Sequence, residues 1–338
     1  MALEFNQLLT LMKIVAKAEP SATTSYSYNN ENFTYDELDS TLRKEMNELA
    51  GTFQLYRENK NILFSLIERT LDDILPKKVM EQYAMFAEIK TYAQGDKPIF
   101  KRKLGRQRAK QFITKVGLDG IYEVFKLGSE YFEVTTSAIG GAAQIGLEEY
   151  LDGRVDFAEL TAIVMEGMDD IVYQEIAKAL ISAVNQLQEA NHHAEAGFNE
   201  AEFDKLLAVA SAYGAPTIYC TYEFAVNMIP AENWITDNMK DERWAKGYFT
   251  KYKGHPVIIL PQSFTDETNT EKVIDPKYCW IIPKGVDGKP VKIAFEGNTI
   301  VDEYKNADRS REIQVYKKVG VGVMVNNGIC AYVNSALA

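Results

Sequence analysis

Cysteine is scarce in this 338-residue sequence. Its three cysteines, Cys220, Cys279 and Cys330, are odd in number, widely separated and surrounded by apolar residues. Thiols in such surroundings usually serve as small core side chains. We therefore expect neither a disulfide framework nor a cysteine metal site.

Motifs that carry chemistry are also missing. The sequence has no glycine-rich phosphate loop, no cysteine pairs at zinc spacing and no nucleophile elbow. His192 and His193 are adjacent, so on a helix they would point in different directions, and His255 precedes Pro256 in an expected extended turn. We predict no catalytic residue, no cofactor and no metal, and hence a protein that is not an enzyme. An enzyme would need a convergent polar pocket, which the sequence does not reveal.

Long apolar runs are absent, and basic residues are outnumbered. No apolar run approaches the roughly 20 residues that a membrane span requires, so we expect no membrane partner. The 48 acidic and 37 basic residues give a formal charge of −11. This balance argues against a general nucleic-acid coat, because polyanion binding depends on neutralising phosphates. A DNA-binding regulator would need a basic helix to read the DNA, whereas the long helix of this sequence is acidic.

What the sequence does contain is one long amphipathic helix at its centre. From Val155 to about Asn191, apolar residues recur mostly at three- and four-residue steps, and Gly167 is the only glycine or proline. At about 1.5 Å per residue the helix would be on the order of 50 Å long. We expect it to form a rigid spine.

Opposite charges are separated along the chain. Six basic residues precede the helix within ten positions: Lys101, Arg102, Lys103, Arg106, Arg108 and Lys110. Acidic residues are concentrated at the start of the helix, among them Glu159, Glu166, Asp169 and Asp170. Most such runs are simply solvated. Our hypothesis is that the basic segment of one subunit docks on the acidic helix of the next. Few aromatic residues flank the basic segment, which argues against base stacking.

The regions before the helix have weaker patterns. Helical periodicity covers Tyr35–Leu49, Asn61–Leu75 and Val79–Ile89, with Pro76 expected to separate the last two. Such short helices bury little apolar surface alone, so we expect them to lie along something else as an arm. Strand-like alternation within 97–132 predicts an extended hairpin, and the small residues of 138–146 suggest a flexible joint.

After the long helix, the sequence predicts an α/β region. Asn199, three residues before Glu202, begins a helix that ends near Gly214. Short strands are expected over the ranges 217–221, 257–260, 278–282 and 291–295. Apolar residues at odd positions from Ile313 to Val325 predict a further strand, interrupted only by Lys317. Asn327 and Gly328 are expected to turn the chain into a hairpin with 329–333.

This order of parts resembles the major capsid protein family of tailed phages, the Hong Kong 97-type shell fold. The segments Ala215–Tyr219, Gly254–Ile259 and Gly320–Val323 are also similar in character to capsid sequences. The resemblance implies an α+β fold with five parts along the chain. They are an N-terminal helical arm (1–96), an E-loop hairpin (97–146), a spine helix of the peripheral domain (147–198), an axial domain (199–296), and a peripheral-domain sheet with a C-terminal hairpin (297–338).

The resemblance also implies a function. Such a protein assembles with copies of itself into pentamers and hexamers of an icosahedral head, built in the host cytoplasm and retained in the virion. Expected partners are portal and scaffolding proteins, a decoration protein, and packaged double-stranded DNA through weak nonspecific contact. An encapsulin, the shell of a cellular compartment, is the alternative, although the long arm and basic hairpin favour a phage shell.

Some relatives cross-link their subunits through an isopeptide bond between an E-loop lysine and a neighbour's asparagine. Lys110 or Lys115 could supply the amine, and Asn326 or Asn327 the amide. Nothing in the sequence selects this reaction, because both residue types are common in hairpins and turns. We do not expect cross-linking.

Overall fold

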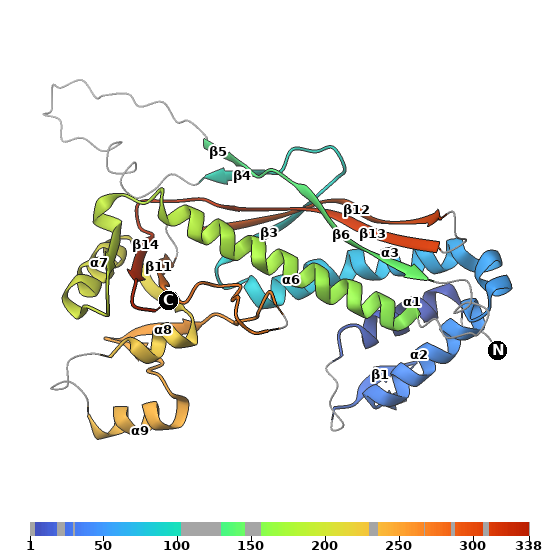
Figure 1. Cartoon of the computed structure of the whole chain (residues 1–338), viewed down its shortest axis with the longest axis horizontal. Helices are drawn as coiled ribbons and strands as arrows, with labels where there is room; N and C mark the ends of the chain where they lie inside the picture. The colour runs from blue at the N-terminus through green and yellow to red at the C-terminus, as the bar shows by residue number, and fades with distance from the viewer. Residues whose placement is uncertain are drawn as a thin grey trace, which may run out of the picture.

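The computed structural model describes residues 4–18, 24–29, 31–102, 130–145, 157–229, 236–266, 268–284, 288–306 and 311–337. The chain forms an elongated body with helices and a four-stranded sheet toward one end and a six-stranded sheet toward the other (Figure 1). Helix α6 (Phe157–Val184) runs along the long axis between them. The architecture is α+β, as predicted.

The four-stranded sheet has the strand order β3-β12-β13-β6. Its strands are β3 (Ala87–Tyr92), β12 (Val291–Lys305), β13 (Arg311–Val323) and β6 (Ser137–Ile145). β12 and β6 are antiparallel to β13, and β3 is parallel to β12. The predicted period-two pattern is confirmed in β13, where Ile313, Val315 and Val319 are buried. Lys317, which interrupts the pattern, is buried with them.

The six-stranded sheet has the order β7-β14-β11-β8-β10-β9. Its strands are β7 (His192–Glu195), β14 (Cys330–Asn334), β11 (Tyr278–Lys284), β8 (Ala215–Cys220), β10 (His255–Ile259) and β9 (Lys251–Tyr252). The helices α7 (Glu200–Tyr213), α8 (Tyr222–Asn227) and α9 (Asp237–Lys246) accompany it. The cap of α7 is as predicted, because the Asn199 side chain accepts hydrogen bonds from the backbone of Ala201 and Glu202. The three cysteines are free and buried in this sheet.

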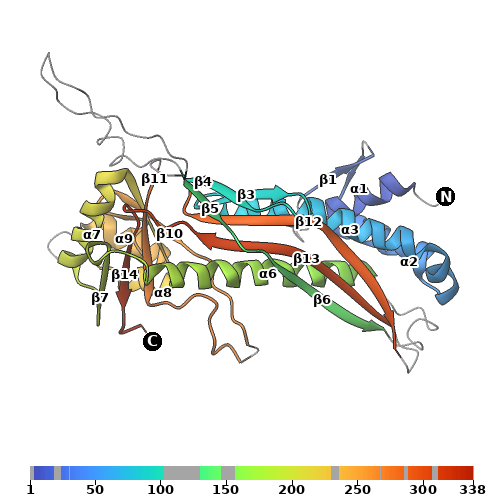
Figure 2. The ribbon, with the colours of Figure 1, turned by 90° about the horizontal axis from the view of Figure 1, so that it is seen from above.

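The N-terminal region contains α1 (Phe5–Val15), α2 (Tyr35–Ala50) and α3 (Phe53–Tyr83), with a small hairpin of β1 (Tyr26–Tyr28) and β2 (Glu31–Phe33) between α1 and α2. α3 runs beside α6 under the four-stranded sheet (Figures 1 and 2). Its buried residues belong to the same hydrophobic core as those of α6, β12 and β13.

Two predictions for this region are wrong. Pro76 does not end a helix but lies inside α3, and residues from Ala87 onward form β3 instead of continuing a helix. Proline in a helix interior costs about 3 kcal/mol. Ile74, Leu75 and Val79 are almost completely buried on either side of it. Their burial offsets the cost.

The N-terminal helices, which were expected to lie along something else as an arm, pack against the rest of their own chain. The ring of Tyr83 stacks on that of Tyr173 from α6, with centroids 5.5 Å apart. Phe86 meets Tyr219 of β8 edge to face at 5.4 Å. Because these contacts lie within one chain, this region is part of the subunit core and not a free limb.

The structure corrects three further expectations. The long helix ends at Val184, and a 3₁₀ turn (Glu189–Asn191) leads into β7. The expected joint within 138–146 is the strand β6. Asn327 and Gly328 do not join a hairpin, because β13 and β14 belong to different sheets. Asn191, which was expected at the end of the helix, instead donates from its buried side-chain amide to the carbonyls of Asn327 and Ile329.

Candidate assembly surfaces

A hairpin projects from the body where the extended loop was predicted. It begins with β4 (Ile99–Arg102) and returns through β5 (Glu130–Glu133), which pair antiparallel (Figure 1). Phe100 is fully buried at its base, in a small cluster with Val134 and Ala294. This apolar anchor fixes the direction in which the hairpin leaves the four-stranded sheet.

Polar contacts hold both ends of the hairpin to β12. Glu296 of β12 accepts a hydrogen bond from the backbone N–H of Gly95, at 3.1 Å, and one from the hydroxyl of Thr136. The ammonium of Lys318 lies 3.3 Å from the same carboxylate. The Thr136 hydroxyl and the Gly95 N–H, with Lys318, hold the pKa of Glu296 below its ordinary value. A carboxylate that is charged at neutral pH thus ties the segments before and after the hairpin together.

The two faces of the hairpin differ in character. Phe100 and Phe132, which are register partners, face the body. On the opposite face, the exposed side chains of Ile99 (38%) and Tyr131 (60%) accompany Lys101 and Glu133. Successive residues of a strand point to opposite faces. Because Phe100 points into the body, its neighbours in β4 point outward, and with Tyr131 they form a candidate contact surface. The predicted patterns did not single out Ile99 or Tyr131.

The structure separates the members of the predicted basic segment. Lys101 and Arg102 lie in β4, and Lys101 is exposed. The other four, Lys103, Arg106, Arg108 and Lys110, lie outside the described residues, as does Lys115.

The predicted acidic residues of α6 do not form one uniform surface. Glu159, Glu166 and Asp170 are exposed, whereas Asp169 is buried. Asp169 forms an ion pair of 3.2 Å with Lys78 of α3. The carboxylate of Asp169 is therefore engaged within its own subunit. Burial, with Asp169 and Glu166 nearby, raises the pKa of Asp170.

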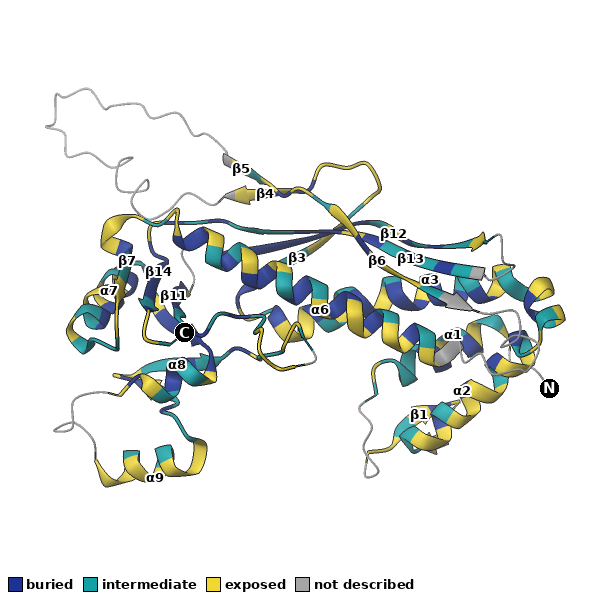
Figure 3. Cartoon of the chain, in the orientation of Figure 1, coloured by how far each residue is buried: buried dark blue, intermediate teal, exposed yellow. Residues whose placement is uncertain are grey.

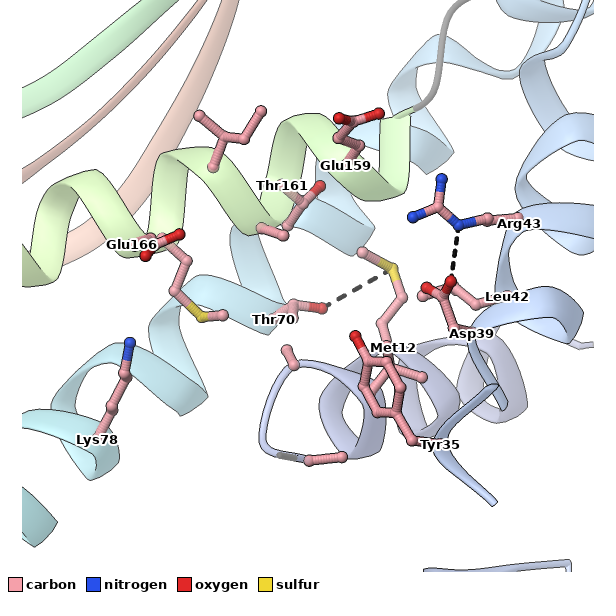
Figure 4. Close-up of a pocket in the computed structure, with 16 residues that line it drawn as sticks. Met12, Tyr35, Asp39, Leu42, Arg43, Thr70, Lys78, Glu159, Thr161 and Glu166 are labelled. Carbon is pink, nitrogen blue, oxygen red and sulfur yellow. Dashed lines mark hydrogen bonds and ion pairs between the residues drawn. The ribbon is translucent and has the colours of Figure 1, made fainter. Parts of the chain in front are cut away.

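Beside this acidic surface, α1, α2, α3 and α6 line an open groove of about 620 Å³ (Figure 4). Arg43 and Lys78 bring positive charge to it, and Glu159 and Glu166 bring negative charge. Arg43 pairs with Asp39 at 2.8 Å. The acidic start of α6 thus lies close to cations of its own chain.

Two buried lysines fix the four-stranded sheet to its surroundings, and no sequence pattern predicted their partners. Lys317 of β13, with 2% of its side chain exposed, forms an ion pair of 2.6 Å with Asp72 of α3. Lys292 of β12, 1% exposed, pairs with Glu88 of β3. Lys317 could have been noticed as the interruption of an apolar pattern, but its partner lies 245 residues away.

Asp72 also binds the irregular part of β12. The pairing of β12 with β13 shifts register between Glu296 and Ile300. There the backbone N–H and hydroxyl of Thr299 both donate to Asp72, each at 2.7 Å. Glu68 accepts from the backbone N–H of Val301 at 3.0 Å. The carboxylates of α3 thereby satisfy donors on the edge of β12 that extends beyond β3.

Helix α9 displays an aromatic side chain. Trp244 is 93% exposed, and α9 has no buried residue. Arg243, with its guanidinium 6.0 Å from the ring centroid of Phe249, and the Glu242–Thr250 hydrogen bond attach α9 to the chain that follows it. Trp244 is a candidate contact residue because exposed tryptophan is rare outside interfaces.

Candidate sites for chemistry are few. Among the described residues, no three His, Cys, Asp or Glu side chains are arranged to hold a metal ion. His193 lies 3.2 Å from Glu195, and burial together with His193 lowers the pKa of His192. Within the same part of the chain, no helix is long and apolar enough to cross a membrane.

Comparison with solved structures gives distant likenesses. The chain is similar to the capsid of a native GTA particle, with 14% identity, a TM-score of 0.49, and coverage of 76% of this chain and 91% of the other. For the head structure of Helicobacter pylori bacteriophage KHP40 the values are 13%, 0.47, 76% and 91%. For the holo-SrpI encapsulin complex from Synechococcus elongatus PCC 7942 they are 10%, 0.43, 74% and 86%.

Comparison at the level of sequence separates the two interpretations left open by the fold. A search of curated protein sequences finds no match. The sequence profile of a family described as "SPbeta prophage-derived putative capsid protein YonB" matches residues 7–334, which is nearly the whole chain. This match supports the phage shell over the encapsulin. The chain belongs to the YonB family of prophage-derived capsid proteins.

Proposed function

We propose that this capsid protein assembles, as many identical copies, into pentamers and hexamers that close an icosahedral head around double-stranded DNA. The observation that carries the proposal is the hairpin, which is anchored in its own subunit on one face and exposes apolar side chains on the other. A compact monomer has no use for such a face. Repeated over a closed shell, individually weak contacts of this kind add up.

The body of the subunit supplies stiffness for this role. α6 is 28 residues long, or about 42 Å at the usual rise per residue. The sheet beside it is held to α3 through the Lys317–Asp72 pair. A frame that does not bend transmits the orientation of one contact to the next. The five parts inferred from the family resemblance remain proposals for how this frame is divided.

Contact between neighbours is proposed to involve the hairpin and α6. In this proposal the basic segment that begins with Lys101 and Arg102 approaches the exposed acidic residues of another copy, Glu159, Glu166 and Asp170. Opposite charges favour this pairing and steer the encounter. The net charge of −11 keeps packaged DNA from binding the wall tightly.

Further partners follow from the same proposal. A portal protein at one vertex, a scaffolding protein during assembly and a decoration protein on the outer surface would each contact the shell. The protein acts by forming contacts and does not catalyse a reaction. It is assembled in the host cytoplasm and then acts in the virion.

Electron microscopy of the purified full-length chain tests the proposal. We expect closed shells of uniform diameter, with sedimentation far above that of a subunit. Tyr131→Asp should leave the subunit folded by circular dichroism but prevent shells, because it replaces the largest exposed apolar side chain on the outer face of the hairpin with a carboxylate. Tyr304→Asp is the matched control, since Tyr304 is a similarly exposed tyrosine on β12, and it should still assemble. A wild-type chain that stays a monomer under all assembly conditions would refute the proposal.

A further inference from the structure

β6 is an edge strand with an open side. It pairs with β13 along nine residues, from Ser137 to Ile145, and no described strand pairs with its other edge. α6 packs near the strand, and Ile139 is buried. Ala138, Gly140, Gly141 and Ala142 are exposed. Figure 3 shows much of the described part of β6 in the colour of exposed residues. Within the part of the chain that the structure describes, the backbone donors and acceptors on this edge of β6 thus have no strand partner.

This edge lacks the features that normally prevent strand addition. Proteins protect sheet edges with charged side chains, proline, bulges or very short strands. β6 contains neither proline nor any ionisable residue, and its register with β13 is continuous. The other edges of the two larger sheets are protected: β3 carries Glu88 and Lys90, β7 has four residues with two histidines and a glutamate, and β9 has two residues.

The two adjacent glycines of β6 provide an independent observation. A Cβ atom on Gly140 would lie 2.2 Å from the carbonyl oxygen of Val315, so the fold of the subunit requires glycine there. A Cβ atom on Gly141 would meet no described atom within 4 Å. Gly141 also has no positive φ angle. Glycine weakens a strand interior and often marks the close approach of another backbone. The subunit itself shows no need for glycine at position 141.

We propose that the open edge of β6 pairs antiparallel with β6 of a second copy of this chain, across a twofold axis, so that two four-stranded sheets become one of eight strands. A twofold contact must be self-complementary. β6 meets this condition because, without charges, it brings no like charges into opposition. Pairing centred on Gly141 places Ile139 opposite Ala143, a large side chain against a small one. The proposal rests on the proposed shell function, which supplies many copies and twofold axes.

Charge exchange at Ala142 tests the self-pairing. Ala142→Lys and Ala142→Glu each place a charge on an exposed position that recurs near the twofold axis. Each variant alone should show wild-type thermal unfolding but at least tenfold fewer closed particles. Mixing the two in equal amounts should restore assembly, because Lys of one copy then lies diagonally across the axis from Glu of the other, on the same face of the sheet. If each variant assembles normally, or if mixing does not restore particles, β6 does not pair with itself.

The glycines give a second test with a matched pair of variants. Gly141→Val should leave the melting temperature of the subunit unchanged or raised, and should reduce particle formation. Gly140→Ala should lower the melting temperature of the subunit itself. Hydrogen exchange should show alternate amides of β6 protected in particles and unprotected in free subunits. Equal exchange in both states would overturn the proposal. Wild-type shells with unaffected Ala142 variants refute only this pairing, whereas absence of wild-type shells refutes the proposed function.

Discussion

The buried ion pair between Asp72 and Lys317 makes a quantitative prediction about the stability of the subunit. Asp72→Ala removes the acceptor of three hydrogen bonds, one from Lys317 and two from Thr299. Only 2% of the Lys317 side chain is exposed, so water cannot replace the lost carboxylate. Removing one partner of a buried pair costs about 3–5 kcal/mol. We expect Asp72→Ala to lower the free energy of unfolding by this amount.

The cost should depend on which partner is removed. The Asp72 side chain is 25% exposed, so after Lys317→Met its carboxylate still reaches water and Thr299. That variant should cost about 1.5 kcal/mol, the contribution of one charge-assisted hydrogen bond. Asp73 is the control on the same helix. Its pair with Lys13 leaves 48% of the carboxylate side chain exposed, so Asp73→Ala should cost about 0–1 kcal/mol.

Urea unfolding of the purified subunits, followed by far-ultraviolet circular dichroism, measures all three values. The expected order of destabilisation is Asp72→Ala, then Lys317→Met, then Asp73→Ala. Asp72→Ala and Asp73→Ala of equal stability would refute the reasoning, because they would mean that burial of Lys317 does not set the cost.

Three further predictions concern the hairpin and α9. At neutral pH, Glu296→Gln should have a lower free energy of unfolding than the wild type, and the difference between the two proteins should depend on pH. Because the folded-state pKa of Glu296 lies below its ordinary value of 4.5, this difference should shrink as the pH falls below about 4.5, and unfolding curves of both proteins between pH 3 and 7 check it. Phe100→Ala should cost about 3 kcal/mol locally and speed hydrogen exchange in β4 and β5, while exchange in β8 stays slow. Trp244→Ala should change subunit stability by less than about 0.5 kcal/mol, whereas Trp280→Ala, which empties a buried position, should cost about 3–5 kcal/mol. A larger effect at Trp244 would mean that this side chain packs within its own subunit.

Features that depend on neighbours in sequence could be read from the sequence. The cap at Asn199 follows from a side chain bonding to amides two and three residues away. The alternation in β13 follows from the geometry of an extended chain with one buried face. The long helix α6 was predicted to continue to about Asn191, seven residues beyond its end at Val184. Asn191 instead bonds to carbonyls more than 130 residues away, a contact that the local pattern does not reveal.

The candidate contact residues also fall into two groups: for some the sequence predicted the exposure correctly, and for one a distant segment decided it. The exposure of Lys101, Glu159, Glu166 and Asp170 agrees with their charge. Asp169 has the same charge but is buried, because Lys78 of a helix that precedes it by about 90 residues lies beside it. Pro76 lies inside a helix because buried residues on either side outweigh the local cost.

Periodicity and capping are local properties, so the long helix and most strands after it could be predicted from the residues, whereas the class of fold followed from the resemblance in the order of these parts. Three features depended on tertiary packing: the N-terminal helices belong to the subunit core, β13 and β14 enter different sheets, and no described strand pairs with the outer edge of β6. Each of these depends on which distant segment supplies a strand, a carboxylate or an apolar face. The free energy of such a contact belongs to both segments, and the pattern of one alone does not identify the other.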